Sequence, residues 1–386
     1  MLIIAAALVV AMGGMGCSSE NEGGTEGVIE HPIDDRIPFH DEATAVTKQQ
    51  TLSACPDPPD VLRMLARVLD SSRAIDTTQT DILVESSQRV EATSISDRRL
   101  ALLVEHPENR LYELNRQNQN TSLIASEGRG PGQVQFASSI AQQDDTLFLG
   151  SKDRRILQFD CRSRPCTFED ETRLQFSPET LTILEDQVAV VGTPMLQREG
   201  MTMEDFTGAV HLVGPTGDIR TSIGRPYHTS HFLVLSSYLR GSSLVHSEPL
   251  QTVGFASQKL PYIWIYRDSG GKERVWRIDD FEPLGIEYSP SDRSRSKEYQ
   301  DSYSLLRLQG PLQERYLVAS VRHMAYVSEG SDIRMRSVDY YALDMETGRS
   351  YYLGRDVPRK GVFDRLFLVS NESTILIENG RVALLQ

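Results

Sequence analysis

A segment near residue 228 combines side chains that could bind a ligand or a metal ion. Gly224–His231 reads GRPYHTSH, so an arginine and a tyrosine stand beside two imidazoles three residues apart. A catalytic zinc ion usually has three protein ligands, and this segment supplies two histidines. The pattern therefore predicts a polar ligand-binding surface made by Arg225, Tyr227, His228 and His231, and no metal site.

Standard catalytic signatures are absent from the chain. It contains no H-E-x-x-H, no G-x-S-x-G and no Walker loop. The carboxylate pairs Asp144-Asp145 and Asp279-Asp280 fall at turn positions, where Asp is favoured for its hydrogen bonds to the backbone. The sequence therefore identifies no catalytic residue.

Two cysteines are spaced for a disulfide across a hairpin. Cys161 and Cys166 flank a four-residue loop, RSRP. Cross-strand neighbours lie close enough for a disulfide after a small adjustment. The alternative is half of a zinc site, but the only other candidate ligand pair is His228 and His231. We predict the disulfide, which leaves Cys55 unpaired.

The charge of the chain is negative and unevenly distributed. The net charge is −14 over 386 residues, and the segment from Cys17 to Asp60 holds ten acidic residues against two basic ones. Nucleic-acid binding needs a cluster of Lys and Arg, which this chain lacks. The composition therefore predicts no nucleic-acid partner.

The first seventeen residues have the features of an export signal. Leu2–Met12 is apolar and too short to span a bilayer, and small residues follow it. The segment GMGCSS around Cys17 resembles a bacterial lipobox, which implies lipidation of Cys17. The alternative is a plain cleaved signal peptide. We predict a signal over residues 1–17 and a disordered acidic tether over 18–57, and the apolar spacing of Asp60–Ser71 predicts a short helix.

From about residue 80 to residue 386, short apolar runs alternate with turn-forming pairs. The clearest copy is Ser138–Glu169. A repeat made only of strands and turns predicts an all-β fold, a β-propeller of four-stranded blades. We label the strands of a blade A to D from the channel outward. For blade four the predicted strands are His231–Ser236, Ser243–His246, Tyr262–Tyr266 and Arg274–Ile278.

The last copy of the repeat predicts how the ring closes. Phe363–Val369 and the hairpin Thr374–Leu385 supply strands A to C of a sixth blade, and then the sequence ends. Asp81–Glu85 reads DILVE and precedes blade one without a blade of its own. Adding this N-terminal strand to the last blade removes an open sheet edge. We predict six blades; the insertion Tyr288–Asp301 leaves five or seven open.

One stretch resembles a known group of proteins. Gly128–Gln133 reads GRGPGQ, and it is followed by Ile140-Ala141 and by DDTLFL at Asp144–Leu149. This resembles the G-x-GPGEF…IA…DGTLYV pattern of bacterial six-bladed propeller lipoproteins related to NHL-repeat proteins, with Gln133-Val134 in place of Glu-Phe. The match covers about residues 126–160. It implies a secreted or lipid-anchored propeller, and it carries over no catalytic residue because the shared motif is a structural turn.

Long insertions predict where a ligand would bind. In propellers the D–A and B–C loops emerge on one face. The sequence places Met195–Thr207, Ser247–Lys259 and Ser328–Arg336 in B–C loops and Asp280–Asp301 in a D–A loop. Long loops on one rim of a rigid scaffold are typical of a binding face.

These observations predict an exported protein of the cell envelope, anchored by a lipid on its periplasmic or outer-membrane face. Its expected role is to bind a ligand or protein partner on the loop-rich face, as a monomer without a cofactor; a soluble secreted or periplasmic protein is the alternative location. An enzyme is less favoured. The alternative function is a metal-dependent hydrolase or lyase with a divalent ion at the channel mouth. A carbohydrate site on Tyr340-Tyr341 and Tyr351-Tyr352 is a third hypothesis, although paired aromatics in strands more often pack between blades.

Overall fold

A computed structural model gives the fold of the chain. It describes residues 28–29, 43–55, 58–69, 77–83, 90–105, 109–118, 120–184, 186–193, 210–224, 232–283, 286–288, 296–298, 302–326, 333–357, 365–370, 373–378 and 381–385. Within this part the chain forms five four-stranded sheets, one five-stranded sheet and one small three-stranded sheet.

Three of the four-stranded sheets follow one another in the first half of the chain. Their strands, in chain order, are β4 Val90–Ser96, β5 Arg99–Val104, β6 Arg110–Asn115 and β7 Thr121–Ala125; β8 Ala137–Gln143, β9 Thr146–Ser151, β10 Arg155–Asp160 and β11 Thr167–Arg173; and β12 Ser177–Leu184, β13 Gln187–Thr193, β14 Val210–Val213 and β15 Ile219–Ile223. Each sheet is an antiparallel meander.

Three more sheets follow in the second half. They consist of β16 Ser243–Ser247, β17 Thr252–Ala256, β18 Tyr262–Arg267 and β19 Lys272–Ile278; β22 Ser302–Leu312, β23 Tyr316–Tyr326, β24 Ile333–Asp344 and β25 Ser350–Asp356; and β26 Arg365–Ser370, β27 Ser373–Glu378 and β28 Arg381–Leu385. The first of these sheets takes β2 Thr44–Val46 as a fifth strand, and the last takes β3 Thr77–Leu83 as its fourth.

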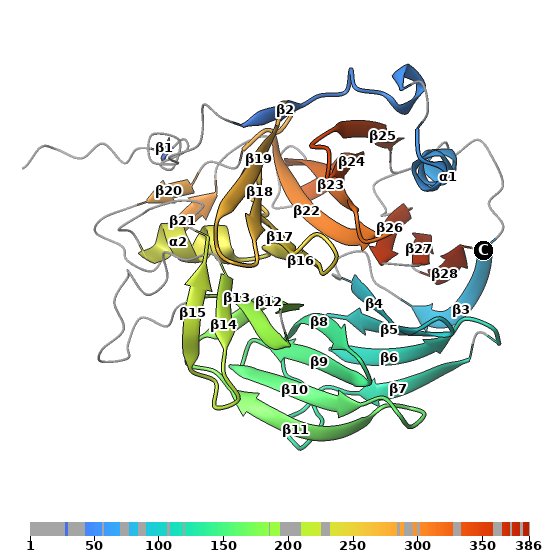
Figure 1. The fold of residues 1–386 in the computed structure, drawn as a ribbon, viewed down its shortest axis with the longest axis vertical. Helices are drawn as coiled ribbons and strands as arrows, with labels where there is room; N and C mark the ends of the chain where they lie inside the picture. Colours follow the sequence, from blue (N-terminus) through green and yellow to red (C-terminus); the bar gives the residue numbers. More distant parts are fainter. Residues whose placement is uncertain are drawn as a thin grey trace, which may run out of the picture.

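The sheets are arranged as the blades of a propeller (Figure 1). The innermost strands contact one another in the order β4, β8, β12, β16, β22, β26 and back to β4. Apolar side chains fill the spaces between neighbouring blades, and Trp264 and Trp276 are completely buried. Because each blade buries its faces against its neighbours, the strand pattern in the sequence is sufficient to predict this class of fold. The prediction of an all-β propeller with four-stranded blades is confirmed.

The N-terminal strand β3 lies at the outer edge of the last sheet. It pairs antiparallel with β28, with Thr77 opposite Leu385 and Leu83 opposite Arg381. The strand begins four residues before the predicted DILVE segment. The pairing covers a sheet edge that would otherwise offer unpaired N–H and C=O groups.

Blade four differs from its predicted strands. Phe232–Leu239, predicted to belong mainly to strand A, is the helix α2, and Gly241 follows it with a φ of +69°. Glycine in this left-handed conformation commonly ends a helix. The predicted strand B is therefore the innermost strand β16, and the predicted loop Ser247–Lys259 contains β17. A short apolar run cannot be assigned to helix or strand by its periodicity alone, which explains the error.

Strand β17 was missed because a glycine interrupts its apolar pattern. A Cβ atom built on Gly254 would lie 3.0 Å from Leu317 of the neighbouring blade. Glycine within a strand often marks such a close approach of two elements. The close packing of blades four and five therefore explains why position 254 is a glycine. This glycine makes the strand difficult to recognise in the sequence.

A segment of the predicted tether is ordered against the blades. Residues 43–55 form a strap: β2 pairs parallel with β19, Tyr352 N–H donates to the Gln50 carbonyl at 2.7 Å, and Thr51 bridges to Tyr352. Val46 is 1% exposed and Leu52 is 8% exposed. The predicted disorder therefore does not apply to residues 43–55. Residues 18–27 and 30–42 lie outside the described part.

Deleting residues 1–57 is expected to lower the free energy of unfolding by about 2–4 kcal/mol, because it removes the apolar contacts that the buried Val46 and Leu52 make with the blades. The deletion also exposes the edge of β19, so association that depends on protein concentration should appear. Urea unfolding and light scattering measure the two effects. A truncated chain as stable and as monodisperse as the full chain would contradict the role of the strap.

The predicted helix is present as α1, Asp60–Leu69. Its residues Leu62, Leu65 and Leu69 are buried and belong to one apolar cluster with Tyr340 and Leu353 of blade five. The apolar spacing that predicts the helix is thus the face that packs on the propeller.

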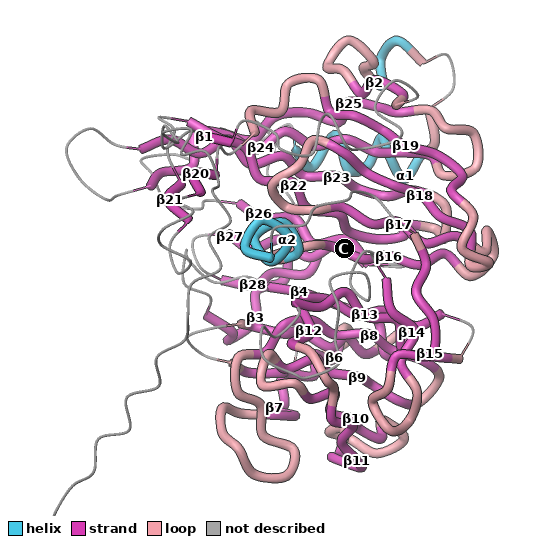
Figure 2. Tube along the Cα trace, turned by 90° about the vertical axis from the view of Figure 1, so that its left-hand side faces the viewer, coloured by secondary structure: helices cyan, strands magenta, loops and turns pink. Residues whose placement is uncertain are grey.

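A small sheet lies on one side of the ring. It joins β1 Val28–Ile29 to β20 Ile286–Tyr288 and β21 Ser296–Glu298, which belong to the predicted D–A insertion. Figure 2 views the ring from the side, with this sheet at its left. Across the described segments, no helix combines the length and the apolar character needed to cross a membrane.

Candidate functional site

A cavity of about 560 Å³ lies at the centre of the propeller. Its walls come from the innermost strands β4, β8, β12, β16 and β22 and from the turns that follow four of them. The inner strands of a propeller converge on its axis, so strands from five different sheets contribute side chains to one space. This central channel is therefore a candidate site.

The turns that line the cavity identify the end at which it opens. Asp144, Asp186, Glu248 and Glu314 belong to A–B turns, and Asp268 belongs to a C–D turn. In an antiparallel meander the A–B and C–D turns lie at one end of a blade, and the B–C and D–A loops lie at the other. The cavity mouth is therefore at the end of the blades that carries the A–B and C–D turns, and Glu248 and Gln251, from the predicted insertion Ser247–Lys259, line it.

An ion pair crosses the wall of the channel. The guanidinium of Arg307 on β22 donates to the Val90 carbonyl at 2.6 Å and lies 3.5 Å from Glu91 Oε1. The other oxygen of Glu91 accepts the Ile140 N–H at 3.1 Å. These contacts join the inner strands β22, β4 and β8, and so fix the walls of the channel relative to one another.

Blade four contributes a histidine and a carboxylate. His246 Nε2 lies 3.0 Å from Asp268 Oδ2, and the Asp268 side chain is 6% exposed. Asp268 lies in a C–D turn. Its backbone N–H donates to the carbonyl of Gln251, which belongs to the A–B turn. The other carboxylate oxygen, Oδ1, is buried and has no hydrogen-bond partner among the described residues.

None of these channel residues was among the site residues predicted from the sequence. The sequence gives little indication that these residues form a site. Asp and Glu at turns are common for structural reasons, and inner strands carry no special motif. Only the curvature of the ring brings them together. A search for polar residues at the ends of predicted A strands could have listed several of them.

The predicted ligand-binding residues lie outside the described residues: Arg225, Tyr227, His228 and His231. The same applies to Cys17 and to the predicted loops 195–207 and 328–332. The described neighbours of the first group are Gly224, which ends blade three with a φ of +72°, and α2, which begins at Phe232.

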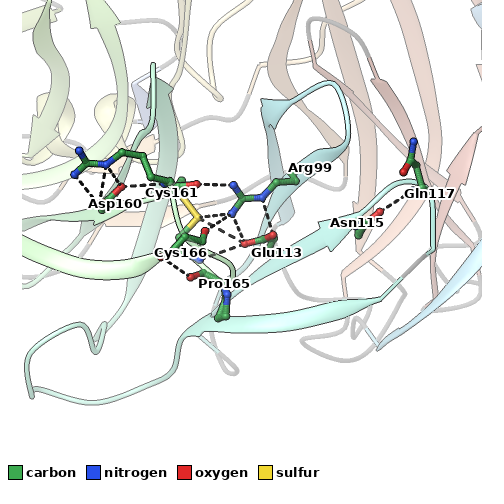
Figure 3. A network of polar contacts seen from close by, with 10 residues as sticks. Arg99, Glu113, Asn115, Gln117, Asp160, Cys161, Pro165 and Cys166 are labelled. Carbon is green, nitrogen blue, oxygen red and sulfur yellow. Dashed lines mark hydrogen bonds and ion pairs between the residues drawn. A yellow bond between two sulfur atoms is a disulfide. The ribbon is translucent and has the colours of Figure 1, made fainter.

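The disulfide predicted between Cys161 and Cys166 is present, and Cys55 is a free cysteine. A buried ion pair from blade one holds the disulfide hairpin (Figure 3). Arg99 Nε and Nη2 donate to the two carboxylate oxygens of Glu113, both at 2.7 Å, and Nη2 also donates to the Ser163 carbonyl at 2.9 Å. The disulfide therefore belongs to a contact between blades one and two.

A second polar cluster centres on Asp339 in blade five, which is completely buried. Its carboxylate accepts two hydrogen bonds from Arg355 at 2.8 Å and one from the Tyr352 hydroxyl at 2.9 Å. It also lies 2.8 Å from His323 Nε2 and 3.1 Å from Lys48 Nζ in the strap. One carboxylate thus joins three strands of the blade to the N-terminal strap.

In this cluster a serine contacts a histidine, and the histidine contacts an aspartate. Ser304 Oγ lies 3.1 Å from His323 Nδ1, and His323 Nε2 faces Asp339. A nucleophilic serine must reach its substrate. Ser304 is 0% exposed, and its hydroxyl accepts the Glu282 N–H at 3.1 Å. The arrangement therefore connects blade five to the preceding linker, and the buried hydroxyl is not placed to attack a substrate.

The Asp339 cluster predicts how stability depends on pH. Burial alone would raise the pKa of Asp339, but the hydrogen bonds from Arg355, His323, Lys48 and Tyr352 outweigh it and hold the pKa far below 3.8. The pKa of Asp344 is also lowered: burial opposes the shift, and Arg315 and Thr347 cause it. Because both pKa values are lower in the folded state, the unfolded state binds more protons in acid.

We therefore expect the stabilisation from these two carboxylates to be complete above pH 3.8, the pKa of an unperturbed aspartate, and to be lost as the pH falls below it. Urea unfolding measured from neutral pH down to acid checks this result. The Asp339→Asn variant should show a shallower loss. An identical slope in the variant and the wild type would contradict the assignment.

The tyrosines considered for a carbohydrate site are not surface platforms. Tyr340 and Tyr341 are each 1% exposed, and Tyr351 is 7% exposed. The ring centroids of Tyr341 and Tyr352 lie 5.4 Å apart. Burial raises the pKa of Tyr341, as expected for a phenol in the core. These rings pack within and between elements, so they do not stack on a sugar.

The GRGPGQ segment is a structural turn, as its glycines predict. Gly132 has a φ of +69°, and Gly128 and Gly130 are in contact range of the Gln133 side chain, whose Oε1 accepts the Gly130 N–H at 2.9 Å. The described residues also contain no group of three or more His, Cys, Asp or Glu side chains arranged to hold a metal ion.

No protein-family model matches the chain, and no curated protein matches its sequence. Solved structures with a similar fold include a protein of Bacteroides fragilis described as exported, with 15% identity and a TM-score of 0.51, over 78% of this chain and 83% of that one. Another is a member of the DUF4221 family from Bacteroides vulgatus, with 9% identity and a TM-score of 0.52, over 81% of this chain and 97% of that one. At these identities the likeness shows that the fold is shared with bacterial proteins.

Proposed function

We propose that this protein is a non-catalytic binding protein of the bacterial envelope, which takes a ligand into the central channel of its propeller. The observation that carries the proposal is the polar cavity of about 560 Å³, walled by five inner strands and open at the A–B turns. Cavities of this size suit small molecules or a few side chains of a partner. The sequence carries no standard catalytic signature, which favours binding over catalysis.

The scaffold of this site is proposed to be a six-bladed ring closed by β3. The cyclic order of contacts between the inner strands and the pairing of β3 with β28 support this closure. A closed ring has no free inner edge, so the channel walls keep a fixed spacing. Rigid walls favour a preformed site, because little ordering is needed when the ligand binds.

We also propose export and a lipid anchor at Cys17. The apolar N-terminus and the lipobox-like segment support this proposal, and a structural neighbour is described as exported. Labelling with a radioactive fatty acid in a bacterial host should mark the wild type but not the Cys17→Ser variant. The disulfide between Cys161 and Cys166 fits an oxidising compartment.

The opposite face carries the second proposal for a binding surface. Arg225, Tyr227, His228 and His231 would form it with the long loops, for a protein or carbohydrate partner. We propose no cofactor and no nucleic acid for either face, and a monomeric protein. A metal-dependent hydrolase remains the alternative proposal, with its ion at the channel mouth.

The test of the channel proposal compares the full chain with a variant whose channel is blocked. Thr182 is half-buried in the channel wall, so Thr182→Trp places an indole in the cavity. A library of charged and neutral metabolites is screened by thermal shift. We expect at least one class to raise the Tm of the wild type but not of Thr182→Trp. Ligands that stabilise both proteins equally would place binding elsewhere.

A further inference from the structure

We propose that the ligand of the channel is an organic cation, bound through an alkyl-ammonium or guanidinium group. This inference rests on the proposed function, because it assumes that the channel is the binding site. It assigns the chemistry of the ligand, which the presence of a cavity alone leaves open.

The first argument is the charge of the lining. Its carboxylates outnumber its cations: they are Glu91, Asp144, Asp186, Glu248, Asp268 and Glu314. Among the described lining residues Arg307 is the one Lys or Arg, and it is already paired with Glu91 and the Val90 carbonyl. Counting Asp, Glu, Lys and Arg alone, the described lining carries five net negative charges. A concave site of one sign concentrates its field and attracts ions of the opposite sign.

The second argument is independent of the charge count. Asp268 is buried with Oδ1 unpaired among the described residues, while its other oxygen faces His246. Ser243, on the same inner strand as His246, is 4% exposed, and its hydroxyl also has no partner in the described part of the chain. Buried polar groups are nearly always hydrogen bonded, because an unmade bond costs about 1–3 kcal/mol. Asp268 also lines the channel, so a hydrogen-bond donor that enters the channel can approach this carboxylate.

The third argument concerns the kind of cation. Ca²⁺ needs six to eight oxygen ligands, and Mg²⁺ needs a near-octahedral set. The described residues hold no cluster of three metal-ligating side chains. An ammonium group instead carries three hydrogen-bond donors, and a guanidinium carries five. Such a group can bind between Asp268 and the acidic turns of the mouth without a preformed coordination shell.

The turns at the mouth can extend this site. The Ser247 hydroxyl is hydrogen bonded to the Glu314 carbonyl, so the A–B turns of blades four and five touch. Glu248 and Glu314 lie on these two turns, and both are exposed. A ligand with a second positive charge could contact the mouth while the first charge reaches Asp268. This geometry favours a polyamine or a pair of basic side chains over a single small amine.

The experiment is calorimetric titration of the purified full chain at low ionic strength. The probes are spermidine, an acetylated and amidated trilysine peptide, and MgCl₂. We expect saturable binding of spermidine, the peptide or both, and Mg²⁺ should compete only weakly. Spermidine alone would indicate a free amine, and the peptide alone would indicate a basic segment of a protein partner. Binding should weaken as salt is added.

The variants locate the site. Asp268→Asn should weaken binding about tenfold or more, because it removes a charged hydrogen-bond acceptor. Glu248→Gln, on an exposed turn, should weaken it about twofold to fivefold, and it keeps the test valid if Asp268→Asn does not fold. Glu169→Gln is the matched control, since Glu169 is exposed on the outer strand β11. It should leave binding unchanged.

Four results would overturn the inference. Equal affinity for Mg²⁺ and spermidine, or equal weakening by Glu169→Gln and Glu248→Gln, would show general charge attraction only. A neutral compound that stabilises the wild type but not Thr182→Trp, with no cation binding, would refute the cation and keep the channel function. If no compound distinguishes the wild type from Thr182→Trp, both proposals fail.

Discussion

Arg99→Met is expected to lower the free energy of unfolding by about 3–5 kcal/mol, because it leaves the Glu113 carboxylate buried without its cation. Arg99 and Glu113 each have side chains that are 7% exposed. The carboxylate also accepts the Cys166 N–H at 3.2 Å, so the loss reaches the disulfide hairpin of the next blade (Figure 3). Urea unfolding followed by tryptophan fluorescence gives the value.

A double variant separates the cost of a buried charge from a loss of packing. Arg99→Met together with Glu113→Met removes both charges and keeps similar volumes, so most of the lost stability should return. Arg162→Met is the control: Arg162 pairs with Asp160 at the surface, where its side chain is 69% exposed, and its loss should be small. If the double variant were as unstable as the single one, the ion pair itself would be net stabilising.

Asp339→Ala is expected to destabilise the chain by about 3 kcal/mol or more, because it removes the acceptor shared by Arg355, His323, Tyr352 and Lys48. The loss should lie near the lower limit for a buried pair, since the Arg355 and Lys48 side chains are 43% and 31% exposed and can be hydrated again. Denaturant unfolding measures the global effect.

The same variant should also loosen the strap at residues 43–55, since Lys48 loses its buried partner. Hydrogen exchange of this segment should become faster than in the wild type, while exchange in β9 and β10 stays unchanged. Lys48→Met is the matched variant: it should speed exchange in the strap with a smaller global loss. Unchanged exchange of the strap in both variants would show that backbone pairing alone holds it.

Part of the fold could be predicted because its signals are local. Alternating apolar residues and turn pairs in Ser138–Glu169 depend only on neighbours in the sequence, and β8 to β11 lie where this pattern places them. The C-x4-C spacing predicted the disulfide for the same reason. Helix α1 was predictable because its apolar face repeats with the helical period.

Other features depend on contacts between distant segments, and the sequence pattern was ambiguous or misleading there. Phe232–Leu239 is apolar enough for a strand, but it forms helix α2 and packs with the core of blades three and four. The composition of the acidic segment 18–57 predicts disorder, yet β19 and β25 offer edges on which its residues 43–55 pair. Local composition does not record the presence of a partner surface.

The sequence by itself determined the class of fold, since the strand repeat can bury its apolar faces only by stacking blades. It also determined the disulfide and the pattern of helix α1. Only the tertiary structure decided the candidate site, because Glu91, Asp268 and Arg307 come from separate blades and meet only when the ring curves around its axis. The physical reason is that strand periodicity is set by neighbouring residues, whereas a channel is made by contacts across the whole chain.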